Sequence, residues 1–413
     1  MSKLSEIKLE KSYVMPTFAR YEVDFVRGEG MHLFDDTGKD YLDFLSGIGV
    51  CSVGHCNRSV TSAIKAQADK LMHVSNYYYI EGRGELSKKV SDILNELEPG
   101  KHAENWKMFY TNSGAESNEC AMKLARLYAK KKMSSSFDAA RYAPRKILVL
   151  EHSFHGRTME TLAATAQSVK QEAFFPLDKD FVKVPINDLQ ALELAFEENG
   201  NQICAAMIEV IQGESGIHEC SAEFLKKLRE LCTSNDALLI CDEVQSGIFR
   251  CGKYGFAFQH FGIRPDIVTI AKGIGNGFPM GICAAISSVA DVFEPGLHGT
   301  TFGGSALAVA AASAVLSVIE EKNIAENVSV VGDYFAEKLK SIPNITEVRG
   351  LGLMRGADIS DDLDAHVVVA KCLDKGLVIN ATGEQTLRFL PPLICASDDV
   401  DDAVEILTQV LTL

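Results

Sequence analysis

The lysine in the stretch TIAKGIGNG points most directly to chemistry in this sequence. Lys272 follows the apolar run 266–271, which is short and rich in β-branched residues and predicts a buried strand. A lysine in a desolvated pocket has a lowered pKa and becomes a nucleophilic amine suited to Schiff-base formation. Gly273, Gly275 and Gly277 follow it, and backbone without side chains leaves room for a ligand. A surface lysine is the structural alternative.

Two further stretches place polar groups beside apolar runs. Asp242 ends the run ALLICD, where a carboxylate is costly unless a cation meets it, and a structural salt bridge is the alternative. Ser113, Gly114 and Ala115 open a helical pattern, and the free N–H groups of a first helical turn suit a phosphate. Ser113 with Glu116 also fits a capping box, and the two interpretations are compatible.

A phosphate site, a Schiff-base lysine and a buried carboxylate together indicate pyridoxal 5′-phosphate (PLP). In that design an aspartate keeps the pyridine nitrogen protonated, so that the ring accepts electrons. Phe154, in the stretch HSFHGR, could cover one face of the flat ring.

These residues must be positioned by a sheet. Their surroundings alternate between amphipathic helical patterns, such as 115–132 and 222–235, and short apolar runs. Near-continuous hydrophobicity is typical of strands covered on both faces, so we predict an α/β fold with a mostly parallel, doubly wound sheet. The runs are 107–111, 146–151, 181–186, 204–211, 237–244, 266–271 and 282–287.

The chain is expected to form two lobes. Residues 61–305 contain the alternating runs and would form a large cofactor-binding domain. Residues 1–60 and 306–413 would form a smaller α/β domain, built from an N-terminal arm and a C-terminal lobe. In open α/β sheets ligands bind at the carboxyl ends of the strands, and here those ends carry TNSGAE, EHSFHGR, EVIQGE, CDEVQ and AKG.

Composition limits the partners. The 413 residues carry a net charge of −15, which argues against nucleic acid or an anionic membrane surface. No apolar run reaches membrane-spanning length, and the opening residues are polar rather than signal-like. None of the 11 cysteines forms a C-x-x-C pair. We expect a reduced, soluble, cytoplasmic protein.

Three other interpretations fit the sequence less well. The glycines of GIGNG could suggest a dinucleotide, but they precede an apolar run rather than a helix. His152 and His155 could form a metal pair, but no further His/Cys cluster supports them, so no metal site is expected. A PLP-type fold that has lost catalysis and acts as a scaffold is disfavoured by the presence of Lys272, Asp242 and Arg157.

The sequence resembles the class III (ω-) aminotransferases of fold type I, and among them most closely the acetylornithine aminotransferases. The resemblance runs essentially from end to end. Its motifs include RGEGMHLFDDTGKDYLDFLSGIGV, TNSGAESNECAMKLAR, FHGRT, IQGESG, DEVQSGIFRCGKYGF, AKGIGNGFPMG, HGTTFGG and LRFLPPL.

The resemblance implies roles for residues at the matching positions. Lys272 would hold the cofactor aldehyde and move the proton between the substrate carbon and the cofactor, while Asp242 would pair with the pyridine nitrogen. Thr301 would reach the phosphate of the neighbouring subunit, which implies a homodimer with shared active sites. The remaining cofactor contacts would be Ser113, Gly114, Ala115, Phe154, Glu243, Val244 and Gln245.

The resemblance also implies how two unlike substrates share one pocket. Arg157 would hold the far carboxylate of either substrate, with Thr300 as a further substrate contact. Arg388 would bind the carboxylate beside the reacting amine of glutamate, and Glu214 would neutralise Arg388 when the other substrate is bound. The implied reaction transfers the δ-amino group of N²-acetyl-L-ornithine to 2-oxoglutarate, giving N-acetyl-L-glutamate 5-semialdehyde and glutamate. Succinylornithine, 4-aminobutyrate, ornithine or a carrier-linked lysine are alternative donors.

Two positions depart from related patterns. Ile48 stands where ornithine δ-aminotransferases carry a tyrosine, which disfavours free ornithine as the donor. Phe18 stands where a tyrosine can help hold a substrate carboxylate, and it lacks the hydroxyl group.

Overall fold

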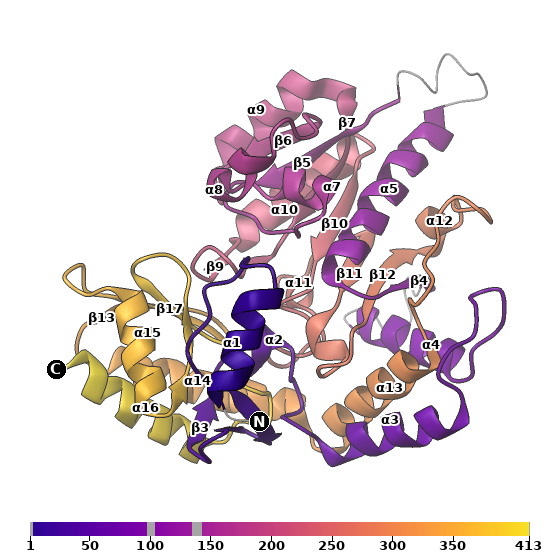
Figure 1. The fold of residues 1–413 in the computed structure, drawn as a ribbon. Coiled ribbons are helices and arrows are strands. Elements are labelled where there is room, and N and C mark those ends of the chain that lie inside the picture. The colour runs from indigo at the N-terminus through magenta and orange to yellow at the C-terminus, as the bar shows by residue number, and fades with distance from the viewer. Residues whose placement is uncertain (1–2, 97–103, 134–142, 413) are drawn as a thin grey trace.

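The computed structural model describes residues 3–96, 104–133 and 143–412. Its central unit is a seven-stranded sheet with the strand order β4-β12-β11-β10-β7-β5-β6 (Figure 1). Neighbouring strands run parallel except around β12, which is antiparallel to both β11 and β4. The strands are β4 (Trp106–Thr111), β5 (Lys146–Leu150), β6 (Phe181–Val184), β7 (Ile203–Ile208), β10 (Leu238–Asp242), β11 (Ile267–Ile270) and β12 (Gly281–Ile286).

The seven apolar runs of the sequence correspond to these seven strands, which confirms the mostly parallel α/β sheet. The apolar run 204–211 extends past the end of its strand, because β7 ends at Ile208. Hydrophobicity could not reveal that β12 runs antiparallel, because a strand buried on both faces reads the same in either direction.

The helices surround the sheet and form much of the second lobe. None of those in the described part of the chain is both long and apolar enough to cross a bilayer. They are α1 (Lys3–Tyr13), α2 (Ser46–Gly49), α3 (Arg58–Lys70), α4 (Arg83–Leu94), α5 (Gly114–Met133), α7 (Met159–Ala164), α8 (Ser168–Gln171), α9 (Leu189–Asn199), α10 (Ala222–Ser234), α11 (Ala257–His260), α12 (Ser287–Ala290), α13 (Ala306–Glu321), α14 (Ile324–Lys340), α15 (Ala365–Asp374) and α16 (Ser397–Leu411).

Both faces of the sheet are buried, as the strand β5 illustrates. Successive side chains of a strand point to opposite faces. Ile147 and Val149 pack in one hydrophobic cluster with Leu124 of α5, whereas Leu148 and Leu150 belong to the cluster on the other face, which also contains residues of α9 and α10. The sheet is thereby held rigidly between two layers, so its strand ends form a fixed frame for a site.

Residues from both ends of the chain build the smaller sheets. One has the order β13-β14-β17-β16, and another has the order β1-β2-β3-β15. Parallel pairing of β15 with β3 joins the N-terminal and C-terminal segments, which Figure 1 shows lying together. The bounds are β1 (Phe25–Glu29), β2 (His32–Asp35), β3 (Asp40–Asp43), β13 (Ile345–Leu351), β14 (Met354–Ile359), β15 (Leu377–Val378), β16 (Asn380–Ala381) and β17 (Thr386–Phe389).

This pairing agrees with a small lobe shared by the two ends of the chain. The boundaries at residues 60 and 305 stay a prediction. Helix α3 contains the boundary at residue 60, α13 begins directly after the one at residue 305, and the two helices pack against each other (Figure 1).

Candidate active site

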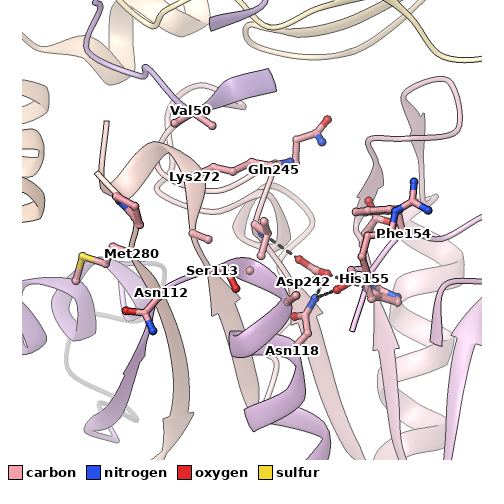
Figure 2. A pocket seen from close by; sticks show the side chains of 18 of the residues that line it. Val50, Asn112, Ser113, Asn118, Phe154, His155, Asp242, Gln245, Lys272 and Met280 are labelled. Atoms are coloured by element: carbon pink, nitrogen blue, oxygen red, sulfur yellow. Dashed lines mark hydrogen bonds and ion pairs between the residues drawn. The ribbon is translucent and has the colours of Figure 1, made fainter. Parts of the chain in front are cut away.

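A cavity of about 400 Å³ opens at the carboxyl ends of the parallel strands. It contains residues that follow β4, β5, β7, β10 and β11, so the sheet brings together segments far apart in the sequence. Figure 2 shows its side chains. The lining residues include Asn112, Ser113, Gly114, Ala115, Asn118, Phe154, His155, Arg157, Glu209, Asp242, Val244, Gln245 and Lys272.

Asp242 lies at the end of β10 and is held by three donors. Its Oδ2 accepts a hydrogen bond from Asn118 Nδ2 at 2.8 Å and lies 2.8 Å from Nδ1 of His155 (Figure 2). Its Oδ1 accepts from the backbone N–H of Val244 at 3.1 Å. Because a carboxylate only accepts hydrogen bonds, His155 must carry its hydrogen on Nδ1. Asp242 is 5% exposed, so these bonds fix a buried, oriented carboxylate.

Ser113, Gly114 and Ala115 come together at the start of α5, at the cavity wall. Ser113 caps the helix, since its Oγ accepts from the N–H of Glu116 at 3.2 Å. The predicted capping box is incomplete: the carboxylate of Glu116 accepts from the backbone N–H and side chain of Asn112 instead, at 2.6 and 2.9 Å. The first turn therefore presents free N–H groups to the cavity, as an anion site requires.

Gly114 is required by a close approach. A Cβ at this position would lie 2.7 Å from Cγ1 of Val244, which itself lines the cavity. The start of α5 and the segment after β10 can approach this closely only because residue 114 has no side chain.

Lys272 enters the cavity directly after β11, at the start of a short 3-10 helix (Lys272–Ile274). Its backbone has φ 49°, in the left-handed region that non-glycine residues rarely adopt. Burial lowers the pKa of its amine to about 8, against an opposing effect of Glu214. Among the residues that the structure describes, none makes a hydrogen bond or ion pair with its Nζ. The lysine is therefore a desolvated amine without a partner.

The sequence predicts that all three glycines after Lys272 leave room for a ligand, but the structure shows this only for Gly277. Gly277 lines the cavity, and a Cβ there would meet nothing within 4 Å, although its φ is +100°. At Gly275 a Cβ would lie 2.1 Å from the carbonyl oxygen of Phe278, so this glycine is required by the turn itself. Gly273 faces Ser52 and does not line the cavity.

Phe154 and Arg157 lie in the loop after β5, at the cavity wall. The carboxylate of Glu209 fixes this loop, because it accepts from the N–H of Phe154 at 2.7 Å and from the N–H of Gly213 at 3.0 Å. The guanidinium carbon of Arg157 lies 5.5 Å from the centre of the Phe154 ring. In the described ranges Arg157 has no carboxylate partner, so it remains free to bind an anion.

Glu214 and Arg388 form an ion pair beside the cavity. Nη1 of Arg388 donates to Oε1 of Glu214 at 2.6 Å and to the carbonyl of Gly213 at 2.7 Å. Gln245, which lines the cavity, donates from Nε2 to the same Glu214 oxygen at 3.1 Å. Burial would raise the pKa of Glu214, but Arg388 and Lys272 offset it and hold that pKa below its usual value. Arg388 is 1% exposed and the side chain of Glu214 is 23% exposed, so the pair is a neutralised and largely buried unit.

Besides Glu214 and Arg388, three predicted contacts do not line this cavity: Glu243, Thr300 and Thr301. The role of Glu243 in cofactor binding stays a prediction, and its carboxylate points away from the cavity: it is fully buried and accepts from Ser246 Oγ and from the N–H groups of Ala257 and Phe258, at 2.7, 3.0 and 2.9 Å. It therefore stabilises the chain below the site. Thr300 and Thr301 line a separate surface hollow of about 1140 Å³, although Thr300 accepts a hydrogen bond from Asn112 at 3.3 Å.

Phe18 also lies away from the cavity of its own chain. It is 75% exposed and lines a hollow of about 240 Å³ formed within the N-terminal segment. Ile48 lies in α2 with φ 66°, two residues before Val50 of the cavity wall.

Sequence reasoning missed three residues of the site. His155 had been considered only as a possible metal ligand paired with His152, whereas the structure directs it to Asp242. Asn118 belongs to the same face of α5 as Gly114, four residues earlier, and that spacing could have indicated it. Glu209 is the first residue after β7, and its place at a parallel strand end was the available signal.

Comparisons with known proteins agree with this geometry. The family model of the class-III aminotransferases matches residues 15–411. The acetylornithine aminotransferase of Caldanaerobacter subterraneus subsp. tengcongensis is 44% identical over 98% of this chain and 99% of its own length. The crystal structure of the acetylornithine aminotransferase from Elizabethkingia anophelis has a TM-score of 0.84 and 32% identity, covering 99% of both chains.

A second solved structure is similar along the whole chain. It is the ornithine aminotransferase from Toxoplasma gondii, crystallised with oxidised glutathione and described as showing partial occupancy of PLP at its active site. The TM-score is 0.90 and the identity 28%, over 100% of this chain and 94% of that one. The family match and the full-length identity together establish that this chain belongs to the class-III aminotransferases.

Proposed function

We propose that the protein transfers the δ-amino group of N²-acetyl-L-ornithine to 2-oxoglutarate, giving N-acetyl-L-glutamate 5-semialdehyde and L-glutamate. The observation that carries this proposal is the site itself: a partnerless lysine amine and an oriented aspartate share one cavity in a class-III aminotransferase chain. Relatives of full length that are named acetylornithine aminotransferases support the choice of donor. That reaction belongs to arginine biosynthesis.

PLP fits the residues that line the cavity. Lys272 offers a desolvated amine, Asp242 a fixed carboxylate, and the start of α5 free N–H groups beside a glycine. Oδ1 of Asn118 is buried and has no hydrogen-bond partner in the described part of the chain, so the cavity also offers a free hydrogen-bond acceptor. When bound, PLP supplies an electron sink that stabilises negative charge on the carbon bearing the amino group.

The protein residues then have separable tasks. Asp242 would hold the proton on the ring nitrogen, and its own orientation is set by Asn118, His155 and the N–H of Val244. Lys272 Nζ, with a pKa of about 8, is suited to take a proton from the substrate carbon and to return it near neutral pH. Phe154 would cover one ring face, because Glu209 holds its backbone at the cavity wall.

The two substrates would be distinguished at Arg388. In acetylornithine, the carbon that bears the reacting amine carries no carboxylate. With this substrate bound, the Glu214–Arg388 pair therefore stays closed as in this structure. With glutamate bound, Glu214 releases Arg388, whose guanidinium fork then binds the adjacent carboxylate. Arg157, which has no carboxylate partner in the described ranges, would hold the far carboxylate of both substrates.

We also propose a homodimer in which Thr301 serves the partner's site, with Thr300 beside it. Both residues line a broad hollow rather than their own chain's cavity. Tyr77, which lines that hollow, is 94% exposed, and Phe302, the neighbour of Thr301 in the chain, is 62% exposed. Large apolar side chains gathered in one exposed region are typical of a surface that another chain covers. All eleven cysteines are free thiols, which agrees with the cytoplasmic location we propose.

Isotope transfer tests the proposed reaction. The purified protein, PLP, 2-oxoglutarate and N-acetylornithine labelled with ¹⁵N at the δ-amino group are incubated together. We expect the label in glutamate and the semialdehyde as co-product, with no transfer by Lys272→Ala. Label that stays in N-acetylornithine, while another ω-amine donates to 2-oxoglutarate, would replace the donor and keep the reaction class.

A further inference from the structure

If Arg388 binds glutamate as proposed, the carboxylate of Glu214 needs a new partner. When glutamate occupies the site, Glu214 must leave Arg388, to which it now lies at 2.6 Å. The side chain of Glu214 is only 23% exposed, so water replaces little of the lost interaction. A partly buried carboxylate that loses its cation is strongly destabilised. The open state therefore requires a second cation within reach of Glu214.

Three cations near the site have no carboxylate partner in the part of the chain that the structure describes: Arg157, Lys170 and Lys272. On the proposed function, Lys272 holds the cofactor in the resting protein and Arg157 binds the far carboxylate of the substrate. Only Lys170 is left with no other task.

Lys170 is held in place by its neighbours. It lies in α8, and its ammonium donates to the side-chain oxygen of Gln167. Gln167 donates from Nε2 to the carbonyl groups of His152 and Ser153, at 2.9 and 3.3 Å. These bonds anchor Lys170 to the loop that carries Phe154. Its Nζ lies 5.6 Å from the centre of the ring of Phe154, and Phe154 lines the cavity.

The charges around Lys170 favour a carboxylate beside it. Burial lowers the pKa of its ammonium, and Arg157 and Arg388 lower it further, while Glu214 exerts the largest opposing effect. The backbone also brings the two groups near each other, because Glu209 accepts from the N–H of Phe154, over whose ring Lys170 lies, and from the N–H of Gly213, the residue before Glu214. The flexible four-carbon stem of a lysine lets the ammonium follow a carboxylate that rotates away from Arg388.

We propose that Lys170 receives the carboxylate of Glu214 when glutamate displaces it from Arg388. Lys170 is then a positioning residue for the glutamate half of the reaction: it acts through Glu214 and does not touch the substrate. This inference rests on the proposed function only in its use of Arg388 for glutamate, and not on which ω-amine is the donor.

The test compares substrates in Lys170→Met, Lys170→Arg and, as a control, Lys179→Met, which removes an exposed lysine. In Lys170→Met we expect KM for glutamate to rise about tenfold, the loss expected from removing a partly buried ion pair, with kcat little changed. KM for N-acetylornithine should change less than about twofold, because the closed pair persists. Lys170→Arg should restore KM for glutamate. Equal rises for both substrates, or none, would overturn the proposal.

A double-mutant cycle separates an action through Glu214 from direct substrate binding. In a Glu214→Gln background we expect Lys170→Met to have no further effect on KM for glutamate. An undiminished effect in that background would show that Lys170 binds the substrate itself, and would contradict the proposal. If the unsubstituted protein reacts with glutamate but not with N-acetylornithine, the donor assignment fails while this test stays decisive.

Discussion

Nδ1 of His155 lies 2.8 Å from Oδ2 of Asp242, inside a cavity where both side chains are almost completely buried. The same oxygen accepts from Asn118, so one residue of α5 and one of the loop after β5 together orient the carboxylate at the end of β10. The charge that would meet the cofactor nitrogen is therefore set by residues outside its own strand.

Removing the imidazole should weaken cofactor binding without abolishing it. We expect His155→Leu to raise the dissociation constant for PLP about tenfold or more, because a hydrogen bond to a buried charged group contributes about 1.5–3 kcal/mol. Titrating the cofactor-free protein with PLP measures it. His152→Asn is the control, since His152 is exposed and asparagine tolerates its φ of 62°. Equal effects of the two substitutions would contradict this positioning role.

The contact between Gly114 and Val244 predicts that a substitution at residue 114 weakens PLP binding and that a second substitution at residue 244 restores it. Gly114→Ala would place a methyl group 2.7 Å from Cγ1 of Val244 and should displace the cavity wall, weakening PLP binding. In Gly114→Ala/Val244→Ala the space is restored, so much of the affinity should return. The same PLP titration measures both. A double variant as weak as Gly114→Ala would indicate that the α5 terminus itself is damaged.

The sequence predicted the strands of the large sheet because each is a short apolar run bounded by polar residues, as at β10 and β11. It could also place Lys272 and Asp242 at one edge, since parallel strands share their carboxyl ends. It could not show that His155 turns towards Asp242, because that bond depends on loop geometry rather than on spacing.

Glu243 shows that the sequence position of a residue does not reveal where its side chain points. It is adjacent to Asp242, yet successive residues leave a strand in different directions, and its carboxylate points to the N–H groups of Ala257 and Phe258. Resemblance alone assigned it to the cofactor. Lys170 was missed for a related reason: a lysine in a four-residue helix carries no sequence signal, and only folding places it beside Phe154.

The lowered pKa of Lys272 predicts how cofactor uptake depends on pH. Only the neutral amine attacks the aldehyde, and burial brings its pKa to about 8. The rate of PLP uptake by the cofactor-free protein should rise as pH increases through about 8 and then level off, whereas an ordinary lysine would keep gaining rate up to about pH 10.4. Stopped-flow absorbance measures the rate. A rate still rising steeply above pH 9 would contradict the desolvated amine.

Hybrid dimers test whether Thr301 acts across the interface. A Lys272→Ala chain and a Thr301→Glu chain should each be nearly inactive alone, the second because a carboxylate repels a phosphate. If Thr301 serves the partner's site, a mixed dimer contains one intact site, and co-expressed chains should regain activity. Purification with two different tags isolates the hybrid. Recovery of no activity would place Thr301 in its own chain's site, and a Thr301→Glu chain that is active alone would place it outside catalysis.

The central claim is tested most directly by the first half of the reaction. The PLP-loaded protein is mixed, without 2-oxoglutarate, with N-acetylornithine, succinylornithine, ornithine or 4-aminobutyrate, and the visible absorbance of the lysine-bound cofactor is followed. The account predicts that N-acetylornithine bleaches it fastest and that Lys272→Ala shows no such band. Faster bleaching by ornithine or 4-aminobutyrate would contradict the donor, and an unsubstituted protein that never acquires the band would contradict the whole account.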